Sequence, residues 1–175
     1  MIYEALTEYR FMNYELIDVV PYIVDADVSA CTKPTDVEDL HHINGKVYIA
    51  SGEQSFIQLM KDGMMDYGKF CCITPCFRNE PIIDDLHHKM FLKIELIEHL
   101  EEFEYIEESV LEMVNDAFTV MSNMCARYEY DIIKTDTGYD ITQNGIEVGS
   151  YGYRETPYGK FVYGTGLAIP RFRGV

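Results

Sequence analysis

The segment from residue 89 to residue 98 constrains the fold most, because two kinds of side chain alternate along it. One set is apolar (Met90, Leu92, Ile94 and Leu96), and the other set is Phe91, Lys93 and Glu95. Successive side chains of a β-strand point to opposite faces of the sheet. The alternation therefore predicts a strand that buries one face in a hydrophobic core and presents an aromatic ring and two charges on the other.

Further strands are predicted over residues 16–24, 46–51 and 69–77. Pro21 places the first of these at an edge or an interface, because proline cannot donate a ladder hydrogen bond. Residues 25–45 are expected to form a long loop, and residues 79–88 a polar loop that joins the strand at 69–77 to the strand at 89–98.

Helical patterns occur at residues 2–14, 53–62 and 103–124. The last of these is the best defined, because its apolar residues recur at positions 103, 106, 110, 113, 114, 117, 121 and 124. That spacing is typical of an amphipathic helix that packs against a sheet. Gly63 ends the middle helix.

Asn144-Gly145 predicts a two-residue type I′ turn between two strands. With residue 143 opposite 146, residue 142 faces 147 and residue 140 faces 149. Asp140 and Glu147 then become diagonal neighbours on one face, close enough for both carboxylates to hold one divalent cation. The alternative is two solvated acids on an acidic protein.

Charge and cysteine content bear on partners and compartment. The chain has 175 residues, enough for one hydrophobic core, and a formal net charge of -16 from 30 acids against 14 Lys and Arg. Because nucleic-acid binding depends on cations that neutralise phosphates, this balance argues against a large nucleic-acid footprint. Five cysteines and no export signal predict a reduced cytoplasm, and no apolar stretch approaches the length of a membrane span.

Zinc is an alternative use of the His and Cys residues. The pairs His41-His42 and His87-His88 could act with Cys72 and Cys76. Cys-x3-Cys on a strand is a poor spacing for a structural zinc site, so zinc is not expected.

Three segments resemble the three motifs of the class II aminoacyl-tRNA synthetases. Residues 11–21 (FMNYELIDVVP) are similar to motif 1, which builds the family's dimer interface. Motif 2 is resembled by residues 77–80 (FRNE) with Phe91 and Glu95, and motif 3 by residues 164–171 (GTGLAIPR). The resemblance implies an α+β fold, with an antiparallel sheet flanked by helices, in a single minimal catalytic domain over residues 1–175 and no anticodon-binding domain.

The resemblance also implies how ATP is held. Arg78 would bridge the α-phosphate and the amino-acid carboxylate, and Arg171 would sandwich the adenine and reach the γ-phosphate, which makes these two arginines the catalytic pair. Glu80 would contact the adenine end, Phe91 would stack on the base, and His87 would lie near the γ-phosphate. The alternatives are surface ion pairs, an ordinary core aromatic residue and a solvent-exposed histidine.

The spacing of three residues near the end resembles the aspartate, asparagine and lysine branch. Asp140 and Glu147 are similar to its magnesium ligands, and Arg154 takes the place of its substrate-reading residue. Gln54 and Glu95 correspond to residues that meet the substrate's ammonium group. An arginine at position 154 favours a substrate with a carboxylate or carboxamide side chain.

Departures from the family pattern modify this prediction. Ile57 stands where aspartyl enzymes place a lysine, which favours asparagine or a related amide or acid. Met90, Ala168 and Pro170 also differ from the usual residues.

The function expected from the resemblance is ATP-dependent, Mg2+-assisted activation of an Asp- or Asn-like amino acid to an aminoacyl adenylate, for a non-tRNA acceptor, by a homodimer that forms through residues 11–21. Two alternatives remain open. One is a catalytically silent paralogue that binds ATP or an amino acid and regulates or dimerises. The other is a synthetase core that charges tRNA with help from a separate subunit.

Overall fold

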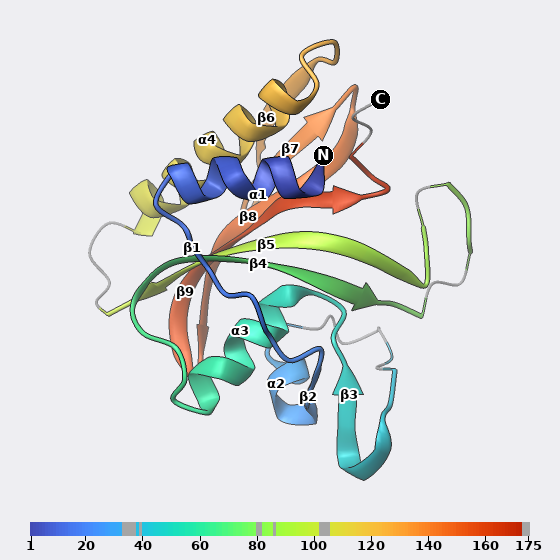
Figure 1. Ribbon diagram of the computed structural model, residues 1–175, viewed down its shortest axis with the longest axis vertical. Helices are drawn as coiled ribbons and strands as arrows, with labels where there is room; N and C mark the ends of the chain where they lie inside the picture. Colours follow the sequence, from blue (N-terminus) through green and yellow to red (C-terminus); the bar gives the residue numbers. More distant parts are fainter. Residues whose placement is uncertain (33–37, 39, 80–81, 86, 102–105, 173–175) are drawn as a thin grey trace.

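The computed structural model describes residues 1–32, 38, 40–79, 82–85, 87–101 and 106–172 (Figure 1). Its centre is a seven-stranded sheet in the order β1-β4-β5-β9-β8-β7-β6. The strands are β1 (Glu15–Leu16), β4 (Gly68–Phe77), β5 (Met90–Leu100), β6 (Tyr130–Lys134), β7 (Gly138–Gln143), β8 (Ile146–Thr156) and β9 (Gly159–Ile169). Neighbouring strands are antiparallel except β1 and β4, which are parallel. The predicted α+β class is confirmed.

Helices α1 (Ile2–Phe11) and α4 (Ile106–Met124) cover one face of the sheet. The core beneath them includes Val110, Met113, Val114, Ala117 and Met121 of α4, together with Ile94, Leu96 and Leu167 of the sheet. Val110, Met113, Val114, Ala117 and Met121 belong to the apolar stripe read from the sequence, so the predicted amphipathic helix is confirmed over the described residues.

The other face carries α3 (Gly52–Lys61), α2 (Ala26–Ala30) and a small antiparallel sheet of β2 (Ile23–Asp25) and β3 (Lys46–Tyr48). The 3-10 turn η1 (Ile43–Gly45) directly precedes β3. A second core lies here, and Phe56, Ile57, Phe70, Ile97 and Phe161 are among its members. A side chain at Gly52 would lie 2.8 Å from Thr74 Oγ1 and 2.9 Å from Glu95 Cβ. Glycine at the start of α3 therefore lets the helix approach β4 and β5 closely.

The predicted strand over residues 16–24 is wrong. Only Glu15–Leu16 and Ile23–Asp25 are strands, and they belong to different sheets. Pro21 lies between them, where its missing N–H would interrupt a continuous ladder. The expected loop over residues 25–45 also contains the short helix α2. No helix in the described parts of the chain is long and apolar enough to cross a membrane.

The Asn144-Gly145 hairpin is confirmed. Gln143 pairs with Ile146, and both turn residues have positive φ, 50° at Asn144 and 77° at Gly145, as a type I′ turn requires. Further from the turn the predicted register is wrong, because a β-bulge between Ile141 and Thr142 shifts the pairing by one residue.

Candidate active site

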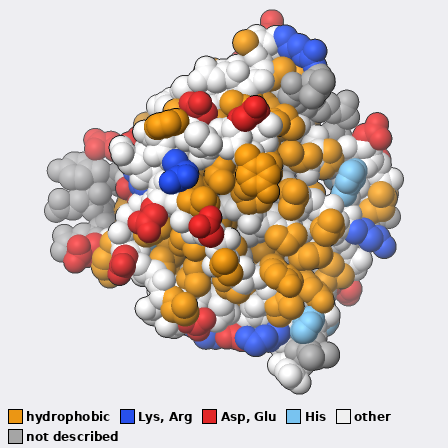
Figure 2. Space-filling model, viewed as in Figure 1, with side chains coloured by type: hydrophobic (Ala, Val, Ile, Leu, Met, Phe, Trp, Pro, Cys, Tyr) orange, Lys and Arg blue, Asp and Glu red, His pale blue; other side chains and the backbone are white. Residues whose placement is uncertain are grey.

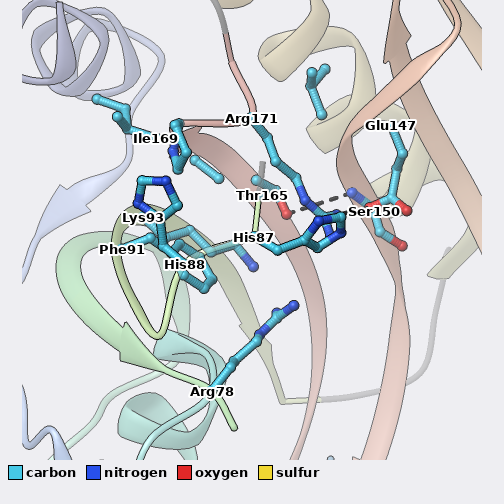
Figure 3. Close-up of a pocket in the computed structure, with 13 residues that line it drawn as sticks. Arg78, His87, His88, Phe91, Lys93, Glu147, Ser150, Thr165, Ile169 and Arg171 are labelled. Carbon is cyan, nitrogen blue, oxygen red and sulfur yellow. Dashed lines mark hydrogen bonds and ion pairs between the residues drawn. The ribbon is translucent and has the colours of Figure 1, made fainter. Parts of the chain in front are cut away.

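A pocket of about 320 Å³ opens where the ends of β4, β5, β8 and β9 meet (Figure 3). Its lining residues are Arg78, His87, His88, Phe91, Lys93, Glu147, Val148, Ser150, Thr165, Ala168, Ile169, Pro170 and Arg171. Of the residues predicted to bind ATP, Arg78, His87, Phe91 and Arg171 are therefore brought together. Glu80 lies outside the described residues.

The charge of this pocket is opposite in sign to that of the protein. Arg78, Lys93 and Arg171 line it, beside His87 and His88, and among the described residues that line it Glu147 is the one acid. Within the described lining, three of the chain's 14 Lys and Arg thus gather beside a single acid, although the whole chain has 30 acids. Because like charges repel unless an anion separates them, this arrangement favours an anionic ligand.

Arg78 follows directly after β4 and is held by backbone contacts on both sides. Its N–H donates to the Lys89 carbonyl at 3.0 Å, and its Nε donates to the Ala50 carbonyl at 3.4 Å. The centre of its guanidinium group lies 5.1 Å from the centre of the Phe91 ring. A planar cation and an aromatic ring are thus presented together at the pocket, an arrangement that can accept a phosphate beside a stacked base.

Arg171 reaches the pocket from the end of β9, and in Figure 3 it approaches from the side opposite Arg78. Its Nη1 lies 3.5 Å from Glu147 Oε1, and both side chains are partly exposed. An exposed pair of this length contributes little to stability, so both groups can exchange this contact for a ligand at small cost.

β-Bulges in β8 and β9 explain why residues three apart line the same pocket. In β8, Glu147 pairs with Thr142 and Ser150 pairs with Asp140. In β9, Thr165 pairs with Glu95 and Ala168 pairs with Lys93. An extra residue in each strand reverses the alternation, so a side chain and the third one after it share a face.

The bulge in β8 corrects the predicted pairing of Asp140. It lies opposite Ser150 and not Gly149, so Asp140 shares the face of Ser150 but does not line the pocket. Ser150 does line it, together with Glu147, and sequence reasoning missed it because a regular strand would have pointed residues 147 and 150 to opposite faces.

Hard oxygen donors for a cation are present in this corner of the pocket. Mg2+ in nucleotide sites takes one or two carboxylates and otherwise uses water and phosphate oxygens. The Glu147 carboxylate, the Ser150 hydroxyl and the Asp140 carboxylate across from Ser150 fit that donor set. Among the described residues no three His, Cys, Asp or Glu side chains gather to hold a metal, so a cation here would need a ligand's oxygens.

His87 keeps an acidic neighbour at the pocket edge. Its Nδ1 lies 2.8 Å from Asp84 Oδ1, and the same carboxylate oxygen accepts the His87 backbone N–H at 2.8 Å. His88 lines the pocket beside it. The carboxylate orients the His87 ring from outside the pocket.

The residues predicted to bind the amino acid lie beyond the pocket and bind protein groups. Gln54 Oε1 accepts the Ala50 N–H at 2.7 Å, and Gln54 Nε2 donates to Ser29 Oγ at 3.0 Å. Arg154 Nε lies 2.6 Å from Glu53 Oε1. Burial raises the pKa of Glu53, and the Arg154 guanidinium offsets part of that rise.

Glu95 is also fully engaged. Its Oε1 lies 2.8 Å from Lys93 Nζ, and its Oε2 accepts the Ser51 hydroxyl at 2.6 Å. Burial alone would lower the pKa of Lys93, but the charge and hydrogen bond of Glu95, together with Cys76, outweigh it and hold the pKa above its ordinary value. Lys93 was missed as a site residue, although its place between Phe91 and Glu95 on the alternating strand is the signal that could have identified it.

Solved structures share this arrangement of strands and helices. Seryl-tRNA synthetase from Pyrococcus horikoshii complexed with ATP superposes with a TM-score of 0.79 over 99% of this chain and 48% of the other, at 17% identity. The fold is that of the class II aminoacyl-tRNA synthetase catalytic core. The predicted resemblance to this core is therefore confirmed at the level of the fold.

Two further structures with this class II core fold are similar. Pyrrolysyl-tRNA synthetase from Desulfitobacterium hafniense gives a TM-score of 0.70 at 14% identity, over 97% of this chain and 65% of the other. Serine-tRNA ligase from Naegleria fowleri in complex with AMP gives 0.72 at 14%, over 95% and 50%. The chain thus spans from about half to two thirds of the length of these synthetases. No family model and no curated protein matches the sequence.

Proposed function

We propose that this protein binds ATP in the cation-lined pocket and activates a carboxylic acid of the amino-acid class as its adenylate. The observation that carries the proposal is that Arg78, Lys93 and Arg171 line one pocket together with Phe91, in a chain of net charge -16. Activation joins two anions, and cations fixed in advance lower the free energy of the charge that develops as they react.

The proposed roles are those that the resemblance implies, and the position of these residues at one pocket supports them. Phe91 stacks on the adenine, Arg78 lies beside it to contact the α-phosphate, and Arg171 contacts the terminal phosphates. His87 lies at the same edge, and the predicted role of Glu80 at the adenine stays a prediction. Mg2+, where bound, would be held by Glu147 with Asp140 or Ser150 and would neutralise phosphate charge.

The substrate and acceptor predicted from the sequence are carried forward as part of this proposal: an Asp- or Asn-like amino acid passed to an amine, ammonia or another non-tRNA acceptor. The acidic charge balance supports an acceptor other than a nucleic acid. Gln54, Glu95 and Arg154 are the proposed substrate-binding residues. Gln54 and Arg154 would have to exchange their present protein partners for the substrate, whereas the Glu95 carboxylate has lone pairs left to accept an ammonium group while it keeps Lys93.

The need to break these contacts within the protein favours a second candidate function. Because Gln54, Glu95 and Arg154 are satisfied within the protein, the chain could bind the nucleotide and not turn it over, as a regulatory paralogue of a synthetase. The nucleotide half of the site would then be the functional part.

ATP-pyrophosphate exchange with each of the twenty amino acids separates the two candidates. Adenylation is supported if one amino acid gives exchange and the exchange rate falls about 100- to 1,000-fold in Arg78→Ala, because loss of one preorganised hydrogen-bond donor to the developing charge has an effect of that size. ATP binding without exchange supports the regulatory paralogue. Absence of ATP binding contradicts both.

The predicted homodimer is a further part of the proposal. Figure 2 shows hydrophobic side chains gathered on the face that α1 and the N-terminal segment cross. Within the predicted interface of residues 11–21, Phe11 is 80% exposed and Val19 is 84% exposed. A second copy of the chain would bury these side chains from water.

A further inference from the structure

We infer that the Lys93 ammonium group binds the carboxylate of the acid that this protein activates, and that Glu95 and Ser51 hold it there. The inference rests on the proposed function and adds a residue to it. The two arginines at the pocket then contact phosphate oxygens, and the lysine contacts the attacking group.

Lys93 lines the pocket and lies between Phe91 and Glu95 along β5. It occupies the same face of β5 as Phe91 and Glu95, and it pairs across the sheet with Ala168, which also lines the pocket. Its side chain is only 12% exposed. A small group such as one carboxylate oxygen fits so narrow an access better than a polyphosphate does.

The position of the amine is fixed by two partners. Glu95 Oε1 lies at 2.8 Å and Ser51 Oγ at 3.4 Å from Lys93 Nζ, while the Ser51 hydroxyl donates to the other oxygen of Glu95. An ammonium group has three donors, so one remains for a ligand. A lysine fixed in this way needs little reorganisation when charge develops nearby.

The energetics also point to a role in binding. Glu95 is 1% exposed, and a buried Lys–Glu pair costs more desolvation than an apolar pair of the same volume would. The surrounding face of the sheet has apolar residues such as Cys72, Ile97 and Phe161 that build the core without charge. The fold alone therefore gives no reason to keep this pair next to the pocket.

The reaction balances without a proton transfer. One oxygen of the acid's carboxylate forms a bond to the α-phosphorus, the bond from that phosphorus to its bridging oxygen breaks, and the electron pair leaves with pyrophosphate. Lys93 holds the second carboxylate oxygen, which keeps the first one directed at phosphorus.

Lys93→Met tests the inference, with Lys69→Met as the matched control. Lys69 lies on the neighbouring strand, is 18% exposed and pairs with Glu112 at 2.6 Å, but does not line the pocket. In ATP-pyrophosphate exchange, Lys93→Met should raise the KM for the acid about 10- to 100-fold, as loss of a charged hydrogen bond does. The KM for ATP should change less than about 3-fold, and Lys93→Arg should recover part of the loss.

Equal effects on both KM values, or no effect on either, would overturn the inference. If no amino acid supports exchange in the wild type, the proposed adenylation is wrong. Binding of the carboxylate to Lys93 is then tested by the rise in melting temperature that an amino acid produces. In saturating ATP, at least one of the twenty amino acids should then stabilise the wild type and Lys69→Met but not Lys93→Met. Without any such stabilisation of the wild type, Lys93 does not bind a carboxylate.

Discussion

The Nε of Arg154 lies 2.6 Å from Oε1 of Glu53, a carboxylate that is almost completely buried at the start of α3. The guanidinium also lies 4.9 Å from the centre of the Tyr163 ring. An arginine predicted to read an acidic or amide substrate is therefore already neutralised by an acid of its own chain. Its first role in this state is to compensate a buried charge.

Arg154→Ala should lower the free energy of unfolding by about 3 kcal/mol at neutral pH, because it leaves the Glu53 carboxylate buried and unpaired. The loss should shrink as the pH falls. Burial raises the folded-state pKa of Glu53 above its ordinary value of 4.5, so the folded protein binds a proton at Glu53 more tightly than the unfolded chain does. The stability that this proton contributes is present at low pH and is lost as the pH rises through the folded-state pKa. Without Arg154 that pKa is higher still.

Chemical denaturation at a series of pH values from about pH 5 to about pH 8 checks this behaviour. The double variant Glu53→Gln/Arg154→Met serves as control, and it should recover most of the stability and show no such pH dependence. A deficit that stays constant with pH would show that Glu53 is not the group responsible.

Phe91→Ala should weaken ATP binding about 5- to 150-fold, because stacking of a base on an aromatic ring contributes about 1–3 kcal/mol. Titration calorimetry with ATP and with sodium triphosphate makes the test specific. Binding of triphosphate, which has no base, should be nearly unchanged in this variant. Equal weakening of both ligands would place the ring in a structural role beneath Arg78.

Glu147→Gln should raise the Mg2+ concentration needed for tight ATP binding by about 10-fold or more, as loss of a carboxylate ligand does. Ser150→Ala should have a larger effect than Asp140→Asn, because Ser150 lines the pocket and Asp140 does not. ATP binding measured in EDTA provides the control. If Glu147→Gln weakens ATP binding as much in EDTA as it does in Mg2+, Glu147 acts through Arg171 and not through a metal ion.

Cys31 should be the one thiol that reacts with an aromatic disulfide in the native protein at about pH 8. It is partly exposed, whereas Cys71, Cys72, Cys76 and Cys125 are buried. Burial also raises the pKa of Cys76 to about 11, which leaves about one thiolate in a thousand at that pH. Peptide mapping after labelling identifies the reacting residue, and denatured protein should label at all five positions.

Val19→Asp should shift the protein toward the monomer in sedimentation equilibrium, raising the dimer dissociation constant about 30-fold or more if Val19 lies at the centre of the interface. Because this side chain is 84% exposed in one chain, the melting temperature of the monomer should hardly change. Met64→Asp, at another exposed apolar position, is the control and should leave the dissociation constant unchanged.

Much of the fold is predictable from local patterns. β5, α3, α4 and the Asn144-Gly145 turn follow from side-chain periodicity and from the turn's need for positive φ. The sequence did not show that residues 15–16 and 23–25 form two separate strands, because an apolar run that contains one proline has the same pattern whether it belongs to one sheet or to two.

The candidate site was predictable where a motif or a regular alternation of side chains marks its residues. Arg78, Phe91 and Arg171 follow from motif and alternation. Ser150 and the shifted partner of Asp140 depend on a bulge, which is set by packing across the sheet and leaves no periodic signal. The engagement of Arg154 by Glu53 joins residues 101 apart in the chain, so only the fold could show it.

A basic pocket inside an acidic molecule has a kinetic consequence. At low ionic strength the far field of a protein with net charge -16 repels a nucleotide polyanion before the pocket can attract it. Dissolved salt screens this field, with a screening length of about 8 Å at physiological ionic strength, and it screens the charges inside the partly enclosed pocket less. Nucleotide association should therefore become faster as salt is first added, the reverse of the trend for proteins that draw phosphates with a basic exterior.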